Sequence, residues 1–151
     1  MPEPFDFTAC EALELIRRKK LGVLELLDSC LSRIEALEPE INAWKFLAPE
    51  AARDRAKKLD NSDPGSPLHG IPLGVKDVID TADMPSGYGS PIYERYRPMA
   101  DAACVAVAHS VDHGRIGLQR HARPQPVGEH RRDHRPVRRL AGFLFDDRCH
   151  G

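Results

Sequence analysis

The stretch GIPLGVKDVID, residues 70–80, decides the fold class because it is a short apolar run that a helix does not tolerate. Its two glycines and its proline disfavour a helix, and turn residues precede it, as is typical of a buried strand. Side chains alternate along a strand, so Lys76 and Asp77 are expected to point to opposite faces. The sequence therefore predicts a buried strand that ends on a lysine.

Lys76 suggests a chemical role for the end of this strand. An amine that leaves water without gaining a counter-ion favours its neutral form, and a neutral amine accepts a proton. That is the property of a general base. The pattern alone favours a simpler alternative, in which Lys76 reaches solvent from the end of the strand.

Three helices are predicted before the strand. Thr8 and Glu11 have the spacing of a capping box and are expected to begin a helix over 8–20. A second helix, over 23–39, has leucine, isoleucine and valine at helical spacing and is expected to end at its proline. A third is expected over 49–59, with a proline in its first turn and turn residues after it.

The sequence around Lys76 resembles that of a known protein family. GSPLHGIPLGVKDVIDTADMPSGYGS, followed by RPMADAACVA, is similar to the N-terminal part of the amidase signature family, whose members hydrolyse carboxylic amides. The preceding LLDSCLSRIEALEPEINAW is similar to the leading helices of that family. The resemblance covers about residues 8–108. One departure is Asp83, where the family usually has glycine in the pattern T-x-G-x-P.

The resemblance implies an α/β fold, the amidase-signature fold, in which helices flank a mixed sheet. This chain would hold only the leading helices, the region of the first strand, and one more helix from about Ala100. The family uses neither a metal nor an organic cofactor, and its substrate is a small-molecule amide. Neither the particular amide nor the oligomeric state follows from the sequence.

The resemblance also implies a serine–serine–lysine triad with Lys76 as its base. In this family the lysine of V-K-D takes a proton through a serine held by a cis peptide bond. That serine activates a second serine, which attacks the amide carbonyl. The family places these serines in a Gly/Ser-rich loop and a later Gly-Gly-Ser element, and the present sequence contains neither. Lys76 is therefore the one candidate catalytic residue, and the 151-residue chain is expected to be inactive.

Composition divides the chain in two. Residues 1–108 carry 13 Lys and Arg against 18 Asp and Glu, and they hold all six lysines. Residues 109–151 carry nine basic residues, all arginine, against five acidic ones, and hold six of the seven histidines. Surface chemistry seldom separates lysine from arginine so completely. We therefore predict an N-terminal fragment of an amidase domain over 1–108 and an irregular, disordered tail outside the family over 109–151.

A frameshift in a GC-rich gene would explain this tail. The string EHRRDHRPVRRL, residues 129–140, can be written with CGN codons for arginine and a CTN codon for Leu140. Read from the third base, these codons permit, among other choices, Thr-Pro-Ala-Gly-Ser-Ser-Ser-Gly-Ser-Ala-Ala. This string resembles the missing Gly/Ser-rich loop at about the expected distance from Lys76. The sequence thus predicts a frameshifted and truncated amidase.

Metal binding by the tail is one alternative function. His109 and His113, and likewise His130 and His134, have the spacing that places two imidazoles on one helical face. Prolines between the two pairs disfavour a continuous helix, and neither pair has the H-E-x-x-H pattern of a zinc enzyme.

Nucleic-acid binding is the other alternative. Five arginines of the tail could contact phosphates, namely Arg131, Arg132, Arg135, Arg138 and Arg139. No aromatic side chain for base stacking lies among them. An accidental, solvated run of charge is the simpler interpretation.

The remaining sequence features indicate a cytoplasmic protein. The N-terminus has no basic segment followed by an apolar one, and no run approaches the roughly 18 apolar residues that span a bilayer. The four cysteines are far apart and form no C-x-x-C pair, so neither a zinc knuckle nor a dithiol motif is predicted.

Overall fold

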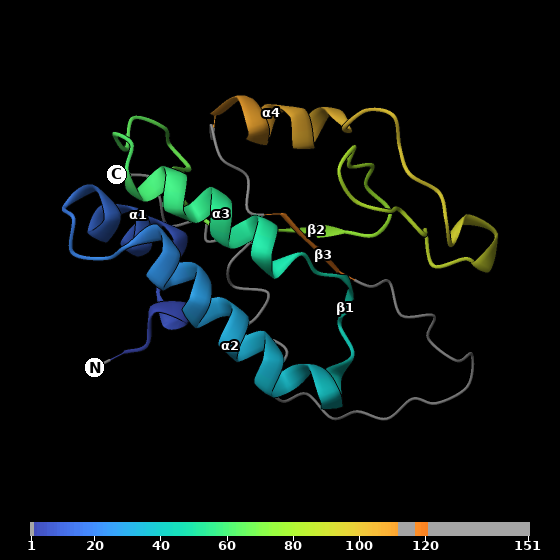
Figure 1. Ribbon diagram of the computed structural model, residues 1–151, viewed down its shortest axis with the longest axis horizontal. Helices are drawn as coiled ribbons and strands as arrows, with labels where there is room; N and C mark the ends of the chain where they lie inside the picture. The colour runs from blue at the N-terminus through green and yellow to red at the C-terminus, as the bar shows by residue number, and fades with distance from the viewer. Residues whose placement is uncertain (1, 112–116, 121–151) are drawn as a thin grey trace.

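The computed structural model describes residues 2–111 and 117–120, which form helices and short strands (Figure 1). In chain order the elements are η1 (Pro4–Asp6), α1 (Ala9–Arg17), α2 (Val23–Ile41), β1 (Trp44–Phe46), α3 (Pro49–Asp60), β2 (Leu73–Lys76), η2 (Pro91–Tyr93), α4 (Ala103–Val111) and β3 (Gly117–Arg120). No helix in this part of the chain is both long and apolar enough to cross a membrane.

Helix α1 begins with the predicted capping box. The Glu11 N–H donates to Thr8 Oγ1 at 3.2 Å, and the Thr8 N–H donates to Glu11 Oε2 at 2.8 Å. Two of the N–H groups that a helix start leaves unpaired are thereby satisfied. The helix ends at Arg17, earlier than predicted, because Lys19 adopts a left-handed conformation with φ of 54°.

Helix α2 continues past the proline that was expected to end it. Pro39 lies inside its last turn, and the helix closes at Asn42, which is left-handed and donates its N–H to Glu38 O at 2.8 Å. The Glu38 carboxylate then accepts the N–H groups of Ala43 at 3.1 Å and Trp44 at 2.8 Å. The prediction was wrong because contacts beyond the proline fix the end of this helix.

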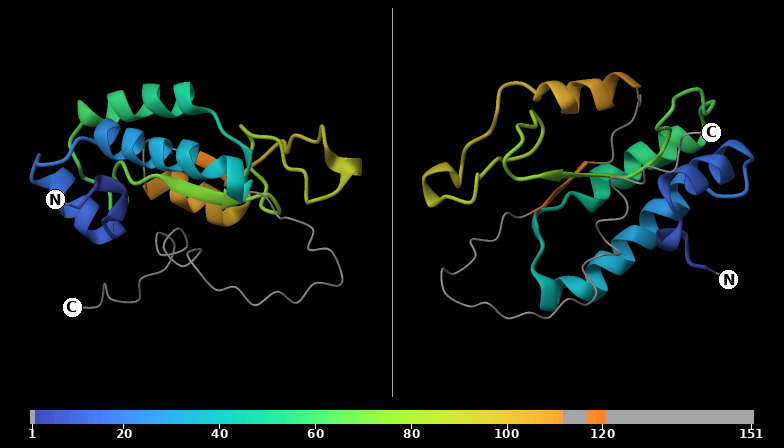
Figure 2. Two further views of the ribbon diagram at one scale, coloured as in Figure 1. Left: turned by 90° about the horizontal axis from the view of Figure 1, so that it is seen from below. Right: turned by 180° about the vertical axis from the view of Figure 1, so that it is seen from behind.

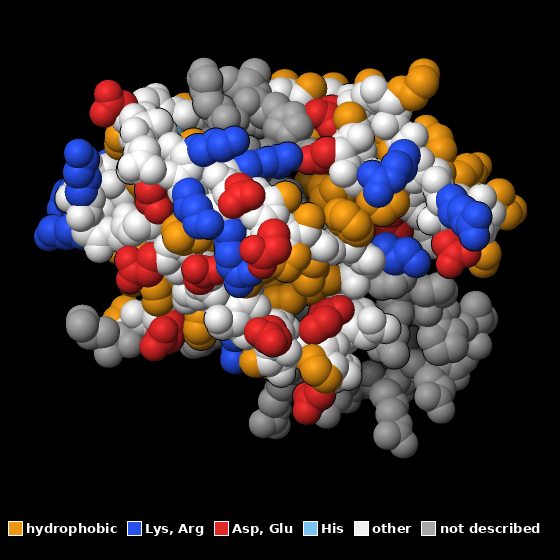
Figure 3. All heavy atoms as spheres, viewed as in Figure 1, with side chains coloured by type: hydrophobic (Ala, Val, Ile, Leu, Met, Phe, Trp, Pro, Cys, Tyr) orange, Lys and Arg blue, Asp and Glu red, His pale blue; other side chains and the backbone are white. Residues whose placement is uncertain are grey.

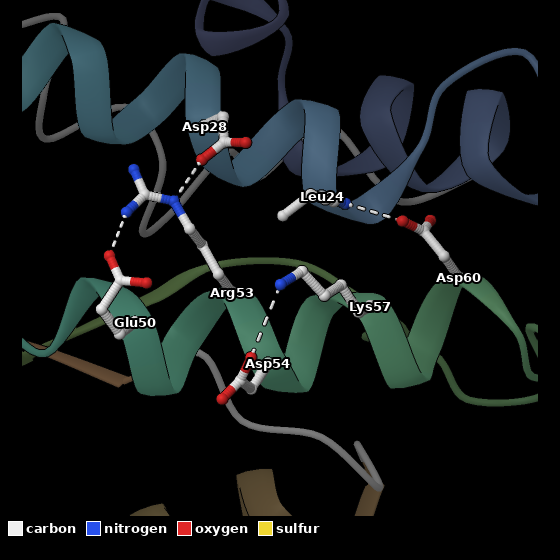
Figure 4. A network of polar contacts seen from close by, with 7 residues as sticks. All are labelled: Leu24, Asp28, Glu50, Arg53, Asp54, Lys57 and Asp60. Atoms are coloured by element: carbon white, nitrogen blue, oxygen red, sulfur yellow. Dashed lines mark hydrogen bonds and ion pairs between the residues drawn. The ribbon is translucent and has the colours of Figure 1, made fainter.

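Helices α2 and α3 run antiparallel, side by side, and lie on the same side of the sheet (Figures 1 and 2). Their facing apolar side chains form most of the core, together with side chains of α1. Asp60, at the end of α3, accepts the N–H groups of Val23 at 2.5 Å and Leu24 at 3.1 Å (Figure 4). One carboxylate thus caps the start of α2 and joins the two helices.

A second polar contact crosses the same helix pair near its middle. Arg53 of α3 donates to Asp28 of α2 at 2.8 Å and to Glu50 at 2.6 Å (Figure 4). Both carboxylates raise the pKa of Arg53, the hydrogen bond to Asp28 most. All three side chains are partly exposed, so the network adds modestly to stability.

The predicted strand is β2, and it belongs to a mixed three-stranded sheet with the order β1-β3-β2. β2 pairs with β3 in parallel, with Leu73 opposite Gly117 and Lys76 opposite Arg120. β1 pairs with β3 antiparallel. The mixed sheet and flanking helices confirm the predicted fold class.

Two of the three strands were not predicted. β1 has three residues and β3 has four, and so short a segment carries no readable alternation. β3 also lies within 109–151, for which composition predicted irregular structure, so Gly117–Arg120 departs from that expectation. The helix expected from about Ala100 is confirmed as α4, and it crosses the proposed boundary at residue 108.

Candidate functional site

Lys76, the predicted base, is the last residue of β2. Its side chain is exposed, whereas its neighbours Val75 and Asp77 are buried. The predicted alternation of Lys76 and Asp77 is therefore confirmed. A general base would require the Lys76 amine to be shielded from water, but the described residues do not bury it. Instead, Lys76 reaches the surface at the end of the strand, as in the simpler alternative.

Asp77 anchors the segment that returns to this strand end. Its carboxylate is fully buried, and Oδ1 accepts the Gly87 N–H at 2.6 Å. Its backbone carbonyl accepts the Tyr88 N–H at 3.0 Å. A Cβ on Gly87 would lie 3.1 Å from Asp77 Oδ2, so the absence of a side chain permits this close approach. Both the side chain and the backbone carbonyl of Asp77, the residue after Lys76, are therefore hydrogen-bonded to the 87–88 segment.

The second oxygen of Asp77 has no hydrogen-bond partner among the described residues. The same holds for the hydroxyl of Thr81, whose side chain is also fully buried. Buried polar atoms are almost always paired, because leaving water without a partner is costly. These two atoms mark a region where the described chain leaves polar groups unsatisfied.

Tyr88 fixes the same loop at a second point. It adopts a left-handed conformation with φ of 49°, and its hydroxyl donates to Asp80 Oδ1. That hydrogen bond, aided by burial and the negative charge of Asp80, raises the pKa of Tyr88 to about 12. The ring centroids of Tyr93 and Tyr96 lie 5.2 Å and 6.0 Å from that of Tyr88. This group of rings connects the loop to η2.

The loop is also joined to the start of α4 and to α3. The Ala102 N–H donates to Asp80 O at 2.9 Å, and the Ala82 N–H donates to Asp101 Oδ1 at 2.8 Å. Asp83, which replaces the family's glycine, forms an ion pair of 3.3 Å with Arg55 of α3. The departure from the family pattern therefore supplies a contact between the loop and the helical layer.

A pocket of about 100 Å³ lies beside this ion pair. It is lined by Phe46, Ala48, Ala51, Ala52, Arg55, Asp83 and Met84. Small-molecule sites usually measure roughly 300–1,000 Å³, so this pocket is small for a substrate. Lys76 is not among its lining residues.

Most residues of the alternative sites lie outside the part of the chain that the structure describes. Within residues 2–111 and 117–120, no group of three or more His, Cys, Asp or Glu side chains could hold a metal ion. The predicted ligands beyond these ranges are His113, His130, His134, Arg131, Arg132, Arg135, Arg138 and Arg139. Of His109 only the backbone, in α4, is described.

Sequence reasoning predicted only that Asp77 points away from Lys76, and it missed the anchoring role of the Asp77 carboxylate. The contact joins residues ten positions apart, and no local pattern encodes it. The one available signal is alternation, since a strand that exposes Lys76 must turn Asp77 inward, where a carboxylate needs a donor.

Comparison with known proteins relates the sequence of this chain to amidases. Residues 25–113 match the family model named Amidase. AmiD of Mycobacterium tuberculosis (strain ATCC 25618 / H37Rv), a putative amidase by its name, is 38% identical over 100 residues, which cover 64% of this chain and 21% of AmiD. A glutamyl-tRNA(Gln) amidotransferase chain of Roseiflexus castenholzii is 37% identical over 105 residues, which cover 68% of this chain and 21% of that protein.

A solved structure agrees with these matches. The native peptide amidase from Stenotrophomonas maltophilia superimposes with a TM-score of 0.68 at 29% sequence identity. The superposition covers 78% of this chain and 25% of the peptide amidase. The chain thus spans about a fifth of the length of the curated relatives it matches, and about a quarter of this solved structure.

Proposed function

This chain belongs to the amidase signature family, and from that premise we propose that Lys76 is the base of a serine–serine–lysine site for amide hydrolysis. The position of Lys76 carries the proposal. It is the last residue of β2, lies inside the matched segment 25–113, and directly precedes the anchored Asp77. A base in this position is fixed along its backbone while its amine remains free to reach a partner.

The proposed chemistry is acyl transfer. The Lys76 amine, in its neutral form, accepts a proton from the bridging serine as that serine takes the proton of the nucleophilic serine. The nucleophile adds to the amide carbonyl, and the relayed proton returns to the leaving nitrogen as the C–N bond breaks. Water then releases the carboxylic acid from the acyl-enzyme by the same relay in reverse.

In this proposal, the surroundings that adjust the pKa of Lys76 come from parts of the amidase fold that have no counterpart in this chain. Lys76 is exposed in the described residues. A lysine base needs to be sheltered from water and to have a serine within hydrogen-bond reach. In the proposal, the serine-bearing segments supply both, and the 151-residue chain alone has no amide-hydrolysing activity.

We further propose that residues after about 108 are out of frame in an interrupted amidase gene. Three observations support this: lysine is absent after Lys76, the family match ends at residue 113, and a Gly/Ser-rich loop is recoverable from 129–140. The nucleotide sequence across codons 105 to 151 and beyond is the test. The proposal predicts a second reading frame that encodes amidase sequence, and it is wrong if no such frame follows codon 108.

A chimera tests the role of Lys76. Residues 2–108 of this chain replace the matched segment of the S. maltophilia peptide amidase, followed by that enzyme's own remaining sequence. We expect the chimera to release ammonia from a peptide amide, and Lys76→Ala to reduce the rate by about 10²–10⁴-fold. Lys58→Ala, an exposed lysine on α3, is the matched control and should leave the rate unchanged. Equal rates for the two variants would disprove the role of Lys76.

A further inference from the structure

Lys45 lies at an irregularity of the sheet. β1 pairs with β3 at Trp44 and at Phe46, and the register shifts between these two positions, so Lys45 is an extra residue in β1. A bulge of this kind redirects a side chain and is common beside functional sites. The side chain of Lys45 is exposed, whereas those of Trp44 and Phe46 are half-buried. The backbone of β1 thus sets Lys45 apart from its neighbours.

The end of the Lys45 side chain lies beside Gly87. A Cβ on Gly87 would have Lys45 Cε at 3.7 Å and the two carboxylate oxygens of Asp77 at 3.1 Å and 3.6 Å as its nearest neighbours. The place that a side chain at position 87 would fill is therefore bordered by a lysine and by a carboxylate. Because residue 87 is glycine, no side chain separates the two.

The carboxylate of Asp77 needs a partner that Lys45 can provide. Oδ1 accepts the Gly87 N–H at 2.6 Å, but Oδ2 is buried and has no hydrogen-bond partner among the described residues. Burial of a charged carboxylate is costly unless a donor or a cation meets it. An ammonium group is both, since it donates hydrogen bonds and balances the negative charge.

The sheet allows this contact. β1 and β2 both pair with β3, so two strand spacings, about 9–10 Å, separate them. From these two strands, Lys45 and the Asp77 carboxylate approach the same point beside Gly87. No ion pair joins them in the structure as it stands, but Nζ is one bond beyond Cε. Rotation of the lysine side chain can therefore carry Nζ toward Asp77 Oδ2 while both strands keep their backbone positions.

Exposed charge alone would not support such a pair. Basic and acidic side chains are interspersed over the face of the molecule shown in Figure 3. Exposed pairs, such as Lys57 with Asp54, contribute little to stability. Lys45 differs because the carboxylate beside it is buried. A charge that is shielded from water is screened less by salt, and loss of its partner is more costly.

From these contacts we infer that Lys45 is the counter-ion of the buried Asp77 carboxylate and, through it, a positioning residue for Lys76. Asp77 directly follows Lys76 and holds the loop against the end of β2, so a cation that fixes Asp77 also fixes the backbone of Lys76. Lys45 also balances a negative charge that would otherwise favour the protonated form of the Lys76 amine, whereas a base must be neutral. The ion pair stands without the proposed function, and its effect on catalysis rests on that function.

A double-mutant cycle on the 151-residue chain tests the ion pair by thermal unfolding. Lys45→Met removes the charge and keeps a long side chain, while Asp77→Asn removes the charge and keeps the acceptor for the Gly87 N–H. We expect Lys45→Met to lower the Tm by about 3 °C or more in the parent chain, but by no more than about 1 °C beside Asp77→Asn. Lys45→Arg keeps the charge and should stay within about 1 °C of the parent. Lys58→Met on α3 is the matched control, and its effect should be equal in both backgrounds.

Hydrogen exchange of the Gly87 amide, followed by NMR, is a second and local measurement. Asp77 accepts this N–H, so the amide should exchange faster when the carboxylate loses its counter-ion and the loop opens more often. We expect exchange to be about 10-fold faster in Lys45→Met and unchanged in Lys45→Arg and Lys58→Met. This comparison decides the question by itself if Asp77→Asn does not fold.

The chimera described above tests the effect on catalysis. Lys45→Met should slow amide hydrolysis by about 10-fold, and Lys45→Arg should hydrolyse at close to the parent rate. An unchanged rate in Lys45→Met would overturn the positioning role.

The remaining outcomes separate the ion pair from the proposed function. The ion pair is overturned if Lys45→Met lowers the Tm equally in both backgrounds, or if Gly87 exchanges at the same rate in Lys45→Met and Lys58→Met. If Lys45 and Asp77 are coupled but the chimera is inactive, or does not depend on Lys76, the ion pair is supported and the proposed function is not.

Discussion

The carboxylate of Asp77 and the backbone of Gly87 meet at 2.6 Å inside the protein, directly behind the exposed Lys76. This contact closes the loop that follows β2 upon the end of the strand. The structure therefore separates two tasks between adjacent residues, since Lys76 projects outward and Asp77 holds the backbone from within. Lys76 could change its surroundings without a change in its own backbone position.

Loss of the Asp77 carboxylate should destabilise this loop. In Asp77→Ala the buried Gly87 N–H loses its acceptor, and we expect the free energy of unfolding to fall by about 1–3 kcal/mol. Urea denaturation followed by the fluorescence of Trp44, the single tryptophan, measures this. Asp63→Ala removes a carboxylate from an exposed turn and should have little effect. Equal midpoints for the two variants would mean that the 2.6 Å contact contributes no stability.

A methyl group at Gly87 should also be destabilising. In Gly87→Ala the new Cβ would lie 3.1 Å from Asp77 Oδ2, so the loop must shift away from the strand. We expect a loss of about 1–3 kcal/mol, as for other overpacked buried sites. Gly65→Ala is the matched control, because a Cβ at Gly65 meets nothing within 4 Å. A loss of similar size at Gly65 would point to a general effect of the substitution instead of crowding at Asp77.

Asp60 should matter more for helix stability than its exposure suggests. Asp60→Ala removes the acceptor for the N–H groups of Val23 and Leu24, and we expect a cost of about 0.5–2 kcal/mol. Asp54→Ala, on the same helix, breaks only an exposed pair with Lys57 at 3.6 Å and should cost much less (Figure 4). Thermal unfolding followed by circular dichroism compares the two variants. Equal Tm values would show that the hydrogen bonds of Asp60 to the start of α2 add no stability.

Tyr88 should make stability depend on pH in the alkaline range. Its pKa is raised to about 12, chiefly by the hydrogen bond to Asp80, so folding favours the protonated phenol. The contribution of this phenol is complete below the unfolded pKa of about 10 and is lost as the pH rises from about 10 to about 12. Unfolding of Tyr88→Phe should therefore be less sensitive to pH in this window than unfolding of Tyr93→Phe. Identical alkaline profiles for the two variants would show that the Asp80 contact does not shift this group.

The elements that could be predicted are those whose signals are local. The capping box of Thr8 and Glu11 lies within four residues, and the apolar spacing of α2 is a property of one helix. The end of α2 depends on Asn42 and on the Glu38 carboxylate, which acts beyond the proline that was expected to end the helix. β1 and β3 form because distant backbones meet, and three or four residues carry no pattern of their own.

In the candidate site, too, the local signal could be predicted and the non-local contacts could not. Lys76 was identified from a motif, because V-K-D is contiguous. The pattern alone favoured a lysine that reaches solvent, and the exposed side chain agrees with that alternative. The desolvated amine of the other interpretation could not be tested from the motif, because burial depends on what packs over the end of the strand. The Asp77–Gly87 contact was missed for a related reason, since only the folded loop brings these two residues together.

The order of strands has a consequence for how the chain assembles during synthesis. The central strand β3 is the last of the three to leave the ribosome, while β1 and β2 come before it. The helical layer of α1, α2 and α3 is built from contacts within the first 71 residues and can form early. The two outer strands must then wait, unpaired, until residues 117–120 arrive between them. Sheet closure is accordingly the slow, non-local step of folding, and the nascent chain is most exposed to aggregation just before it.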